Sequence, residues 1–203
     1  LPPNAYVFRL RGEQGASGEL LPGYYLAMDP SGQVQDVPGI PTKEPTFGLP
    51  AWWVSAGERE KLEMAGFTVV DPSTVLVTHL TEFIKANAHV LLGRQEVKEL
   101  LEAVKEKDPA VVEELTPDLL SLGEIQKVLQ NLLKEGIPLR DLVTILEALA
   151  DGARISKDVD FLTEYVRAAL ARTITRLFLG AQNKLEVITL HPRLEQLIVD
   201  SLQ

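Results

Sequence analysis

Cysteine is absent from the 203 residues of this sequence. Its absence excludes thiol nucleophiles, disulfide bonds and thiolate metal sites, and it fits a reducing compartment. No run of about 18 apolar residues is present, so no stretch reads as a membrane-spanning helix. The chain opens with Leu1-Pro2-Pro3-Asn4, without an initiator methionine or a basic and apolar leader. We therefore expect a piece of a longer protein, whose remainder could hold membrane segments.

Basic residues are also in short supply. The chain has 20 Lys and Arg against 29 Asp and Glu, a net charge of −9 at pH 7. This balance argues against nucleic-acid binding, which needs a surface that neutralises phosphates, and against attraction to anionic lipid. Hydrophobic residues make up 45% of the chain, which is ordinary for a globular protein.

Catalytic signatures are missing as well. The sequence has no GxSxG elbow, phosphate-binding loop, dinucleotide fingerprint or HExxH motif. His79, His89 and His191 lack metal-type spacing, and a lone helix histidine is usually structural. Ser73 near Asp71 has no partner base, and helix capping explains both residues. We therefore expect no cofactor, no metal and no enzymatic activity.

Strand and helix patterns alternate over the first ninety residues. Strands are expected at 6–10, 24–28 and 67–70, a short helix between a capping box at 55–58 and Gly66, and a long helix at 73–91. Asp71 and Pro72 supply the N-cap and first turn of the long helix. Six of the 13 prolines lie between Pro22 and Pro50, a density that forbids a long helix and favours an ordered connection.

The long helix carries apolar residues on more than one side. Its expected buried stripe consists of Leu76, Leu80, Phe83, Ile84 and Leu91. At roughly 100° per residue, Val75 and Thr78 fall on a different side. Either another subdomain covers these two residues, or they face outward.

Helical patterns alone follow Gly93, including a second capping box at 121–124. Short loops between capped helices indicate a compact antiparallel helical subdomain. A strand at 185–190 and a helix at 192–202 are expected beyond it. The fold class is therefore α+β with several subdomains: small α/β subdomains, an all-helical one, and the start of a further α/β subdomain. The expected divisions are 1–22 with 72–91, an inserted 23–71, the helical 92–171, and 172–203.

Four segments carry a family resemblance. They are EPTFGLPAWWVS, GFTVVDPSTVLVTHL, GRQEVKELL and LGEIQKVLQNLLKEGIPLRDLVTILEALAD. Together they resemble the C-terminal cytoplasmic region of the FHIPEP family of type III export-gate proteins, and the flagellar branch fits better than the virulence branch. The resemblance covers essentially the whole chain.

The resemblance implies a function in protein export. Family members form a ring of identical subunits below the export pore, receive export chaperones loaded with flagellar proteins, and work with other export-apparatus proteins. It implies a location at the cytoplasmic face of the bacterial inner membrane, with membrane contact only through an N-terminal transmembrane region outside this sequence.

The resemblance also implies a site. The family's chaperone-docking recess lies between its first and second subdomains. The matching positions here are Glu44, Phe47, Val70, Val75 and Thr78, with Pro30 and Val34 lining the same recess. The acidic position is usually Asp in the family, so the glutamate keeps the charge and adds one methylene.

Other readings remain open. From the residues alone, all of these positions are interpreted as core between subdomains. The helical block could instead serve a purely structural, ring-forming domain of a virulence secretion gate. An enzyme would rest on Ser73 and the acidic helices after Gly93. At least one indole of the Trp52-Trp53 pair should belong to the core, since aromatic side chains bury large areas.

Overall fold

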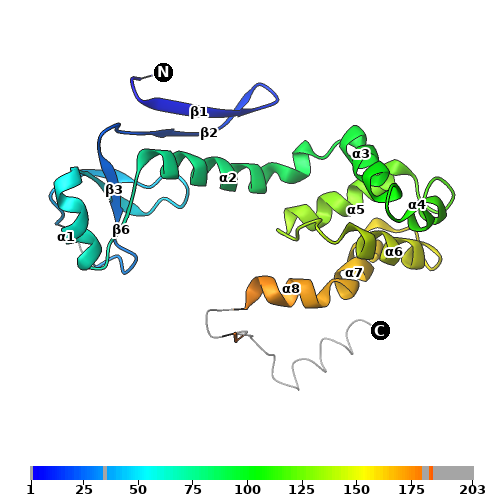
Figure 1. The fold of residues 1–203 in the computed structure, drawn as a ribbon. Coiled ribbons are helices and arrows are strands. Elements are labelled where there is room, and N and C mark those ends of the chain that lie inside the picture. The colour runs from blue at the N-terminus through cyan, green and yellow to red at the C-terminus, as the bar shows by residue number, and fades with distance from the viewer. Residues whose placement is uncertain (1, 34–35, 180–182, 185–203) are drawn as a thin grey trace, which may run out of the picture. The chain divides into compact units, whose positions relative to one another are not determined.

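The computed structural model describes residues 2–33, 36–179 and 183–184 (Figure 1). The chain divides into two compact units, Leu1–Leu91 and Leu92–Gln203. The first combines strands with helices, and the described part of the second is helical, so the expected α+β class is confirmed. The finer division into subdomains stays a prediction.

The first unit holds two antiparallel sheets. One is a hairpin of β1 (Ala5–Leu10) and β2 (Glu13–Glu19). The other has the strand order β4-β5-β3-β6, made of Ile40–Lys43, Pro50–Val54, Tyr25–Met28 and Thr68–Val70. The proline-rich connection therefore contains two short strands, β4 and β5, whose prolines lie at a sheet edge and at a strand start.

Both faces of the four-stranded sheet are buried. Successive residues of a strand point to opposite faces, and Leu26 and Ala27 of β3 are both fully buried. Leu26 packs with Trp53 in one core cluster, whereas Ala27 packs with Trp52 in another. Both indoles of the tryptophan pair are buried, which confirms that at least one belongs to the core.

The start of the short helix differs from the expectation. A 3₁₀ turn, η1 (Ala56–Glu58), precedes α1 (Arg59–Met64), and the Ser55 side chain makes no capping hydrogen bond. The predicted capping box at 55–58 is therefore wrong, because the 3₁₀ turn removes Glu58 from the N3 position of an α-helix. The end is as predicted: Gly66 adopts a φ of +90°, which ends the helix in a left-handed turn.

Helix α2 (Pro72–Leu91) begins where the sequence predicts. The Asp71 Oδ1 atom accepts a hydrogen bond of 2.6 Å from the backbone N–H of Thr74. This bond lowers the pKa of the Asp71 carboxyl, because it stabilises the ionised form. Asp71 as N-cap and Pro72 in the first turn are both confirmed.

The predicted buried stripe of α2 is wrong. Val75 and His79 are the buried residues of this helix, while Leu80, Ile84 and Leu91 are exposed. The neighbours of α2 decide the outcome: Val75 packs on the residues of β3 and β5, and His79 packs on the rings of β1. Only Leu76 and Phe83 of the expected stripe are half-buried.

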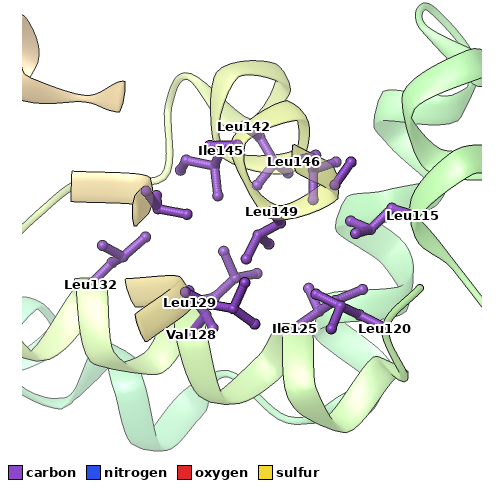
Figure 2. Close-up of a cluster of buried hydrophobic side chains, with 14 of the residues drawn as sticks. Leu115, Leu120, Ile125, Val128, Leu129, Leu132, Leu142, Ile145, Leu146 and Leu149 are labelled. Atoms are coloured by element: carbon purple, nitrogen blue, oxygen red, sulfur yellow. The ribbon is translucent and has the colours of Figure 1, made fainter. Parts of the chain in front are cut away.

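The helical unit consists of α3 to α8 in its described part. Their bounds are Arg94–Lys105, Pro109–Leu115, Leu122–Lys134, Leu142–Ala153, Val159–Ala169 and Ala171–Phe178. Figure 2 shows leucine, isoleucine and valine side chains of several of these helices meeting in one core. Fully burying one such side chain contributes roughly 1.5–3 kcal/mol.

The second capping box is confirmed. The Ser121 Oγ atom accepts the backbone N–H of Glu124, and the Glu124 carboxylate accepts the backbone N–H of Ser121 at 2.7 Å. These bonds, led by the backbone N–H of Ser121, lower the pKa of the Glu124 carboxyl. The same bonds provide partners for backbone N–H groups at the start of α5 that have none within the helix.

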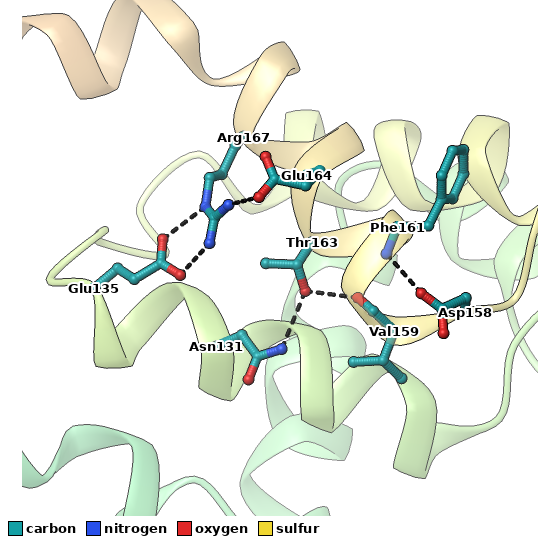
Figure 3. Close-up of polar contacts among 8 residues, drawn as sticks. All are labelled: Asn131, Glu135, Asp158, Val159, Phe161, Thr163, Glu164 and Arg167. Carbon is teal, nitrogen blue, oxygen red and sulfur yellow. Dashed lines mark hydrogen bonds and ion pairs between the residues drawn. The ribbon is translucent and has the colours of Figure 1, made fainter. Parts of the chain in front are cut away.

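Polar contacts join α5 to α7 at the edge of the core (Figure 3). The Asn131 amide donates to the Thr163 hydroxyl at 3.2 Å, and that hydroxyl donates to the carbonyl of Val159 at 2.7 Å. Arg167 of α7 pairs with Glu135 and with Glu164. The hydrogen bonds that the Arg167 guanidinium donates to the Glu135 carboxylate are the main reason that the pKa of Arg167 is raised.

Two expectations fall on parts that the structure does not describe. The strand at 185–190 and the helix at 192–202 lie outside the described residues, as does the candidate site residue Val34.

The two predicted capping boxes, of which only the one at 121–124 forms, allow a matched test. We expect Ser121→Ala to lower the free energy of unfolding of the helical unit by about 1 kcal/mol, because it removes a cap bond. Ser55→Ala should leave the stability of the first unit nearly unchanged, because its hydroxyl caps nothing. Urea denaturation followed by circular dichroism measures both. Equal losses from the two variants would contradict the difference between the two helix starts.

Candidate docking site

The turn between β4 and β5 is built around the buried carboxylate of Glu44. This side chain is 4% exposed. Its two oxygens accept the backbone N–H groups of Thr46 and Phe47 at 2.8 and 2.6 Å. The backbone N–H of Glu44 donates to the carbonyl of Leu49 at 2.8 Å, and Gly48 adopts a φ of +70° that a side chain would disfavour. A buried charge is tolerated here because both oxygens are hydrogen-bonded.

This turn presents apolar side chains to solvent. Phe47 in the turn is 65% exposed, and Leu49 at the end of the turn is 44% exposed. Ile40, at the other end of β4, is 49% exposed. The carboxylate of Glu44 accepts the backbone N–H of Phe47 and thereby fixes the backbone position from which the ring projects. An exposed aromatic side chain on a rigid turn is a suitable anchor for a protein partner.

Val75 is buried, and Val70 is half-buried against the same core. Val75 is 3% exposed and packs with Leu26, Ala51 and Trp53, and Val70 packs against the same cluster. Thr78, one helical turn after Val75, is half-buried. The structure thus joins Val70 and Val75 in one core cluster and leaves Thr78 accessible.

Two further predicted site residues are Pro30 and Glu44. Pro30 is exposed, in the connection that follows β3. Both carboxylate oxygens of Glu44 bind the turn and hold the backbone of Phe47. The role of Glu44 as a polar contact for a partner stays a prediction.

A tyrosine and a histidine that sequence reasoning did not assign to the site link β1 to α2. The Tyr6 hydroxyl and His79 Nδ1 lie 2.7 Å apart, and the rings of Phe8 and His79 have centroids 5.1 Å apart. Burial, with a smaller contribution from the negative charge of Glu44, raises the pKa of Tyr6 to about 12. His79 is therefore a structural residue, as a lone helix histidine usually is. The alternation Tyr6-Val7-Phe8 was the one signal in the sequence that could have located its partners.

The described residues offer little for metal chemistry. Within residues 2–33, 36–179 and 183–184, no group of three or more His, Asp or Glu side chains is placed to hold a metal ion. None of the helices described has the length and apolar character needed to cross a membrane. What the site supplies is an apolar, hydrogen-bonded and rigid surface, which suits binding.

Comparison with known proteins identifies the relatives of this chain. The model of the FHIPEP family matches residues 1–203. The flagellar biosynthesis protein FlhA of Bacillus subtilis is 49% identical over 203 residues, which cover all of this chain and 30% of that protein. The chain thus spans about a third of the length of this relative.

Solved structures give the same answer for the fold. The CdsV protein of Chlamydia pneumoniae aligns with a TM-score of 0.84 at 31% identity, covering 99% of this chain and 63% of that one. The same protein was also solved in a complex with CdsO, with a TM-score of 0.81. The nonameric cytosolic domain of EscV from a type III secretion system aligns with a TM-score of 0.66 at 26% identity, covering 86% of this chain and 52% of that one.

The fold therefore has the architecture of the cytosolic domains of type III secretion gate proteins. The chain belongs to the FHIPEP family, as the four sequence segments predicted.

The two causes of the raised Tyr6 pKa can be separated by titration. We expect Tyr6 to ionise near pH 12. Glu44→Gln should lower this pKa but leave it above the ordinary value of about 10, because burial is the larger cause. The stability that Tyr6 contributes is fully present below its unfolded pKa and is lost as the pH rises through the folded one.

Carbon-13 NMR of labelled tyrosine rings measures the change. The matched control is Glu60→Gln, because Glu60 is an exposed carboxylate on α1. This substitution should leave the pKa of Tyr6 unchanged. A Glu44→Gln variant whose Tyr6 titrates at the ordinary value would show that charge, not burial, is the main cause.

Proposed function

We propose that this chain is part of the gate of a flagellar type III export apparatus, where it docks export chaperones loaded with their cargo and orders their delivery. The observation that carries the proposal is the match of the whole chain, at 49% identity, to a flagellar biosynthesis protein FlhA. The site residues inferred from the resemblance give the docking surface. The protein works by binding rather than by catalysis.

The exposed ring of Phe47 is the proposed anchor. It enters an apolar pocket of the chaperone, or packs against an apolar side chain that the chaperone presents. Leu49 at the end of the same turn is also exposed, and the family resemblance assigns Thr78 of α2, which is half-buried, to the same site. Val70 and Val75 support the proposed site through the core cluster that they share. Pro30 and Val34 are assigned to the site by the family resemblance, and Val34 lies outside the described residues.

Glu44 preorganises this anchor. Its carboxylate holds the backbone N–H of Phe47, so less conformational freedom is lost when the ring is immobilised by a partner. An aspartate at this position would reach the same N–H groups from one methylene closer to the backbone.

The proposed setting is a homo-oligomeric ring at the cytoplasmic face of the bacterial inner membrane. The nonameric assembly of the EscV cytosolic domain supports a ring of this chain. The complex of CdsV with CdsO supports contacts with other export-apparatus proteins. The alternative is a purely structural ring domain of a virulence gate, in which no partner uses the Phe47 surface. The high identity to FlhA favours the flagellar reading.

Truncating the anchor is the direct test. We expect Phe47→Ala to weaken binding of a chaperone–cargo complex by about tenfold or more, since central aromatic contacts contribute about 2 kcal/mol or more. Thr78→Met should weaken binding as well, because the longer side chain obstructs the border of the site. Titration calorimetry measures the affinity.

Met64→Ala is the matched control, since Met64 is an exposed apolar residue of the same unit that the site does not include. All three variants should keep the circular-dichroism spectrum of the parent chain. Phe47→Ala with unchanged affinity and an intact spectrum would refute docking at this surface and leave the structural alternative.

A further inference from the structure

A groove between α6 and α7 of the helical unit lies outside the docking site. Its volume is about 470 Å³. Side chains of both helices line it, among them Glu147, Ala148, Asp151, Tyr165, Ala168 and Ala169. Three of these six are alanines, so short side chains leave the space between the helices open.

The groove is acidic at its rim and apolar inside. Glu147 and Asp151 lie four residues apart on α6, so both occupy one side of that helix. No basic side chain lines the groove, and neither acid forms a salt bridge with any described residue. Tyr165 adds a half-buried ring. A fitting occupant is therefore a helix with basic residues on one side and apolar residues beside them.

Helix α8 of this chain has that pattern. Its sequence is ARTITRLF, with Arg172 and Arg176 four residues apart. Both arginines are exposed and lack a salt-bridge partner among the residues described. Leu177 and Phe178 beside them are exposed large apolar side chains. Only Ile174 of this helix packs against the core of its own unit.

Helix α8 cannot enter the groove of its own chain. Ala168 and Ala169, which line the groove, end α7, and α8 begins two residues later at Ala171. A turn of one residue does not reverse a helix onto the groove that its own predecessor forms, and Ile174 already holds α8 elsewhere. An α8 helix that fills this groove therefore belongs to another molecule.

We propose that the α6–α7 groove binds α8 of a second copy of this chain. The two surfaces differ, so the contact is head-to-tail, and such contacts build rings when the rotation between copies closes. Local complementarity is needed because two chains of net charge −9 repel each other. This inference rests on the ring assembly of the proposed function and adds the surfaces that make it.

The absence of cysteine makes crosslinking a clean test. Ala168→Cys places a thiol in the groove, and Thr175→Cys places one on α8 between the two arginines. Mixed under oxidising conditions, the two single variants should form a disulfide-linked heterodimer at least fivefold faster than Ala168→Cys mixed with Ala103→Cys. Ala103 is an exposed residue of α3 and serves as the matched control.

Charge reversal adds an independent arm. Glu147→Lys with Asp151→Lys in the groove partner, or Arg172→Glu with Arg176→Glu in the α8 partner, should each reduce crosslinking to the control level. Combining the two reversed partners should restore it. All four side chains are exposed, so we expect unchanged circular-dichroism spectra.

The outcomes separate this contact from ring assembly itself. Sedimentation of the parent chain reports assembly without reference to any one surface. Oligomers that crosslink no faster at this pair than at the control would overturn the groove contact and leave the ring standing. A chain that stays monomeric and forms no crosslink would overturn both, while the calorimetric test of Phe47 would still decide chaperone docking.

Discussion

The first unit depends on one constraint: the four-stranded sheet has apolar side chains on both faces, and each face must be covered. Residues of β3 show this most directly, since Leu26 and Ala27 are neighbours in sequence and are buried in different clusters. Leu62 of α1 lies in the cluster of one face, and Val75 of α2 lies in the cluster of the other. The position of α2 follows from this, because Val75 is the residue that the sheet can bury.

That position of α2 determines what the docking site can offer. Val75 faces the sheet and His79 faces the β1–β2 hairpin, whereas Thr78 lies on the other side of Val75 from His79 and stays half-buried. The β4–β5 turn reverses the usual pattern of burial, because the carboxylate of Glu44 is buried and the ring of Phe47 is exposed. The buried carboxylate of Glu44 satisfies two backbone N–H groups, and the exposed ring of Phe47 is what remains for a partner. The site is thus a consequence of how the sheet is covered.

The helical unit also has to bury its apolar side chains, and it does so in a single core between helices. Its helices bury their leucine stripes in one core (Figure 2), and polar pairs such as Asn131 with Thr163 fix their register at the edge (Figure 3). The alanines that let α6 and α7 approach also leave a groove between them.

Local signals in the sequence determined much of this protein. Residues that act through their own backbone were predictable, because capping and turn chemistry involve neighbours in the chain: Asp71 and Ser121 cap their helices, and Gly66 ends one. The family followed from four contiguous segments, and most of the helices after Gly93 followed from their apolar periodicity.

Only the tertiary structure decided which residues are buried. On α2 the apolar stripe of Leu80, Ile84 and Leu91 remained exposed, because burial depends on where the neighbouring strands lie and not on which side of a helix is most apolar. The hydrogen bond between Tyr6 and His79 joins residues 73 positions apart, and no local pattern encodes such a pair. The burial of the Glu44 side chain has the same origin. Its partners are close in sequence, but its burial comes from the fold around it.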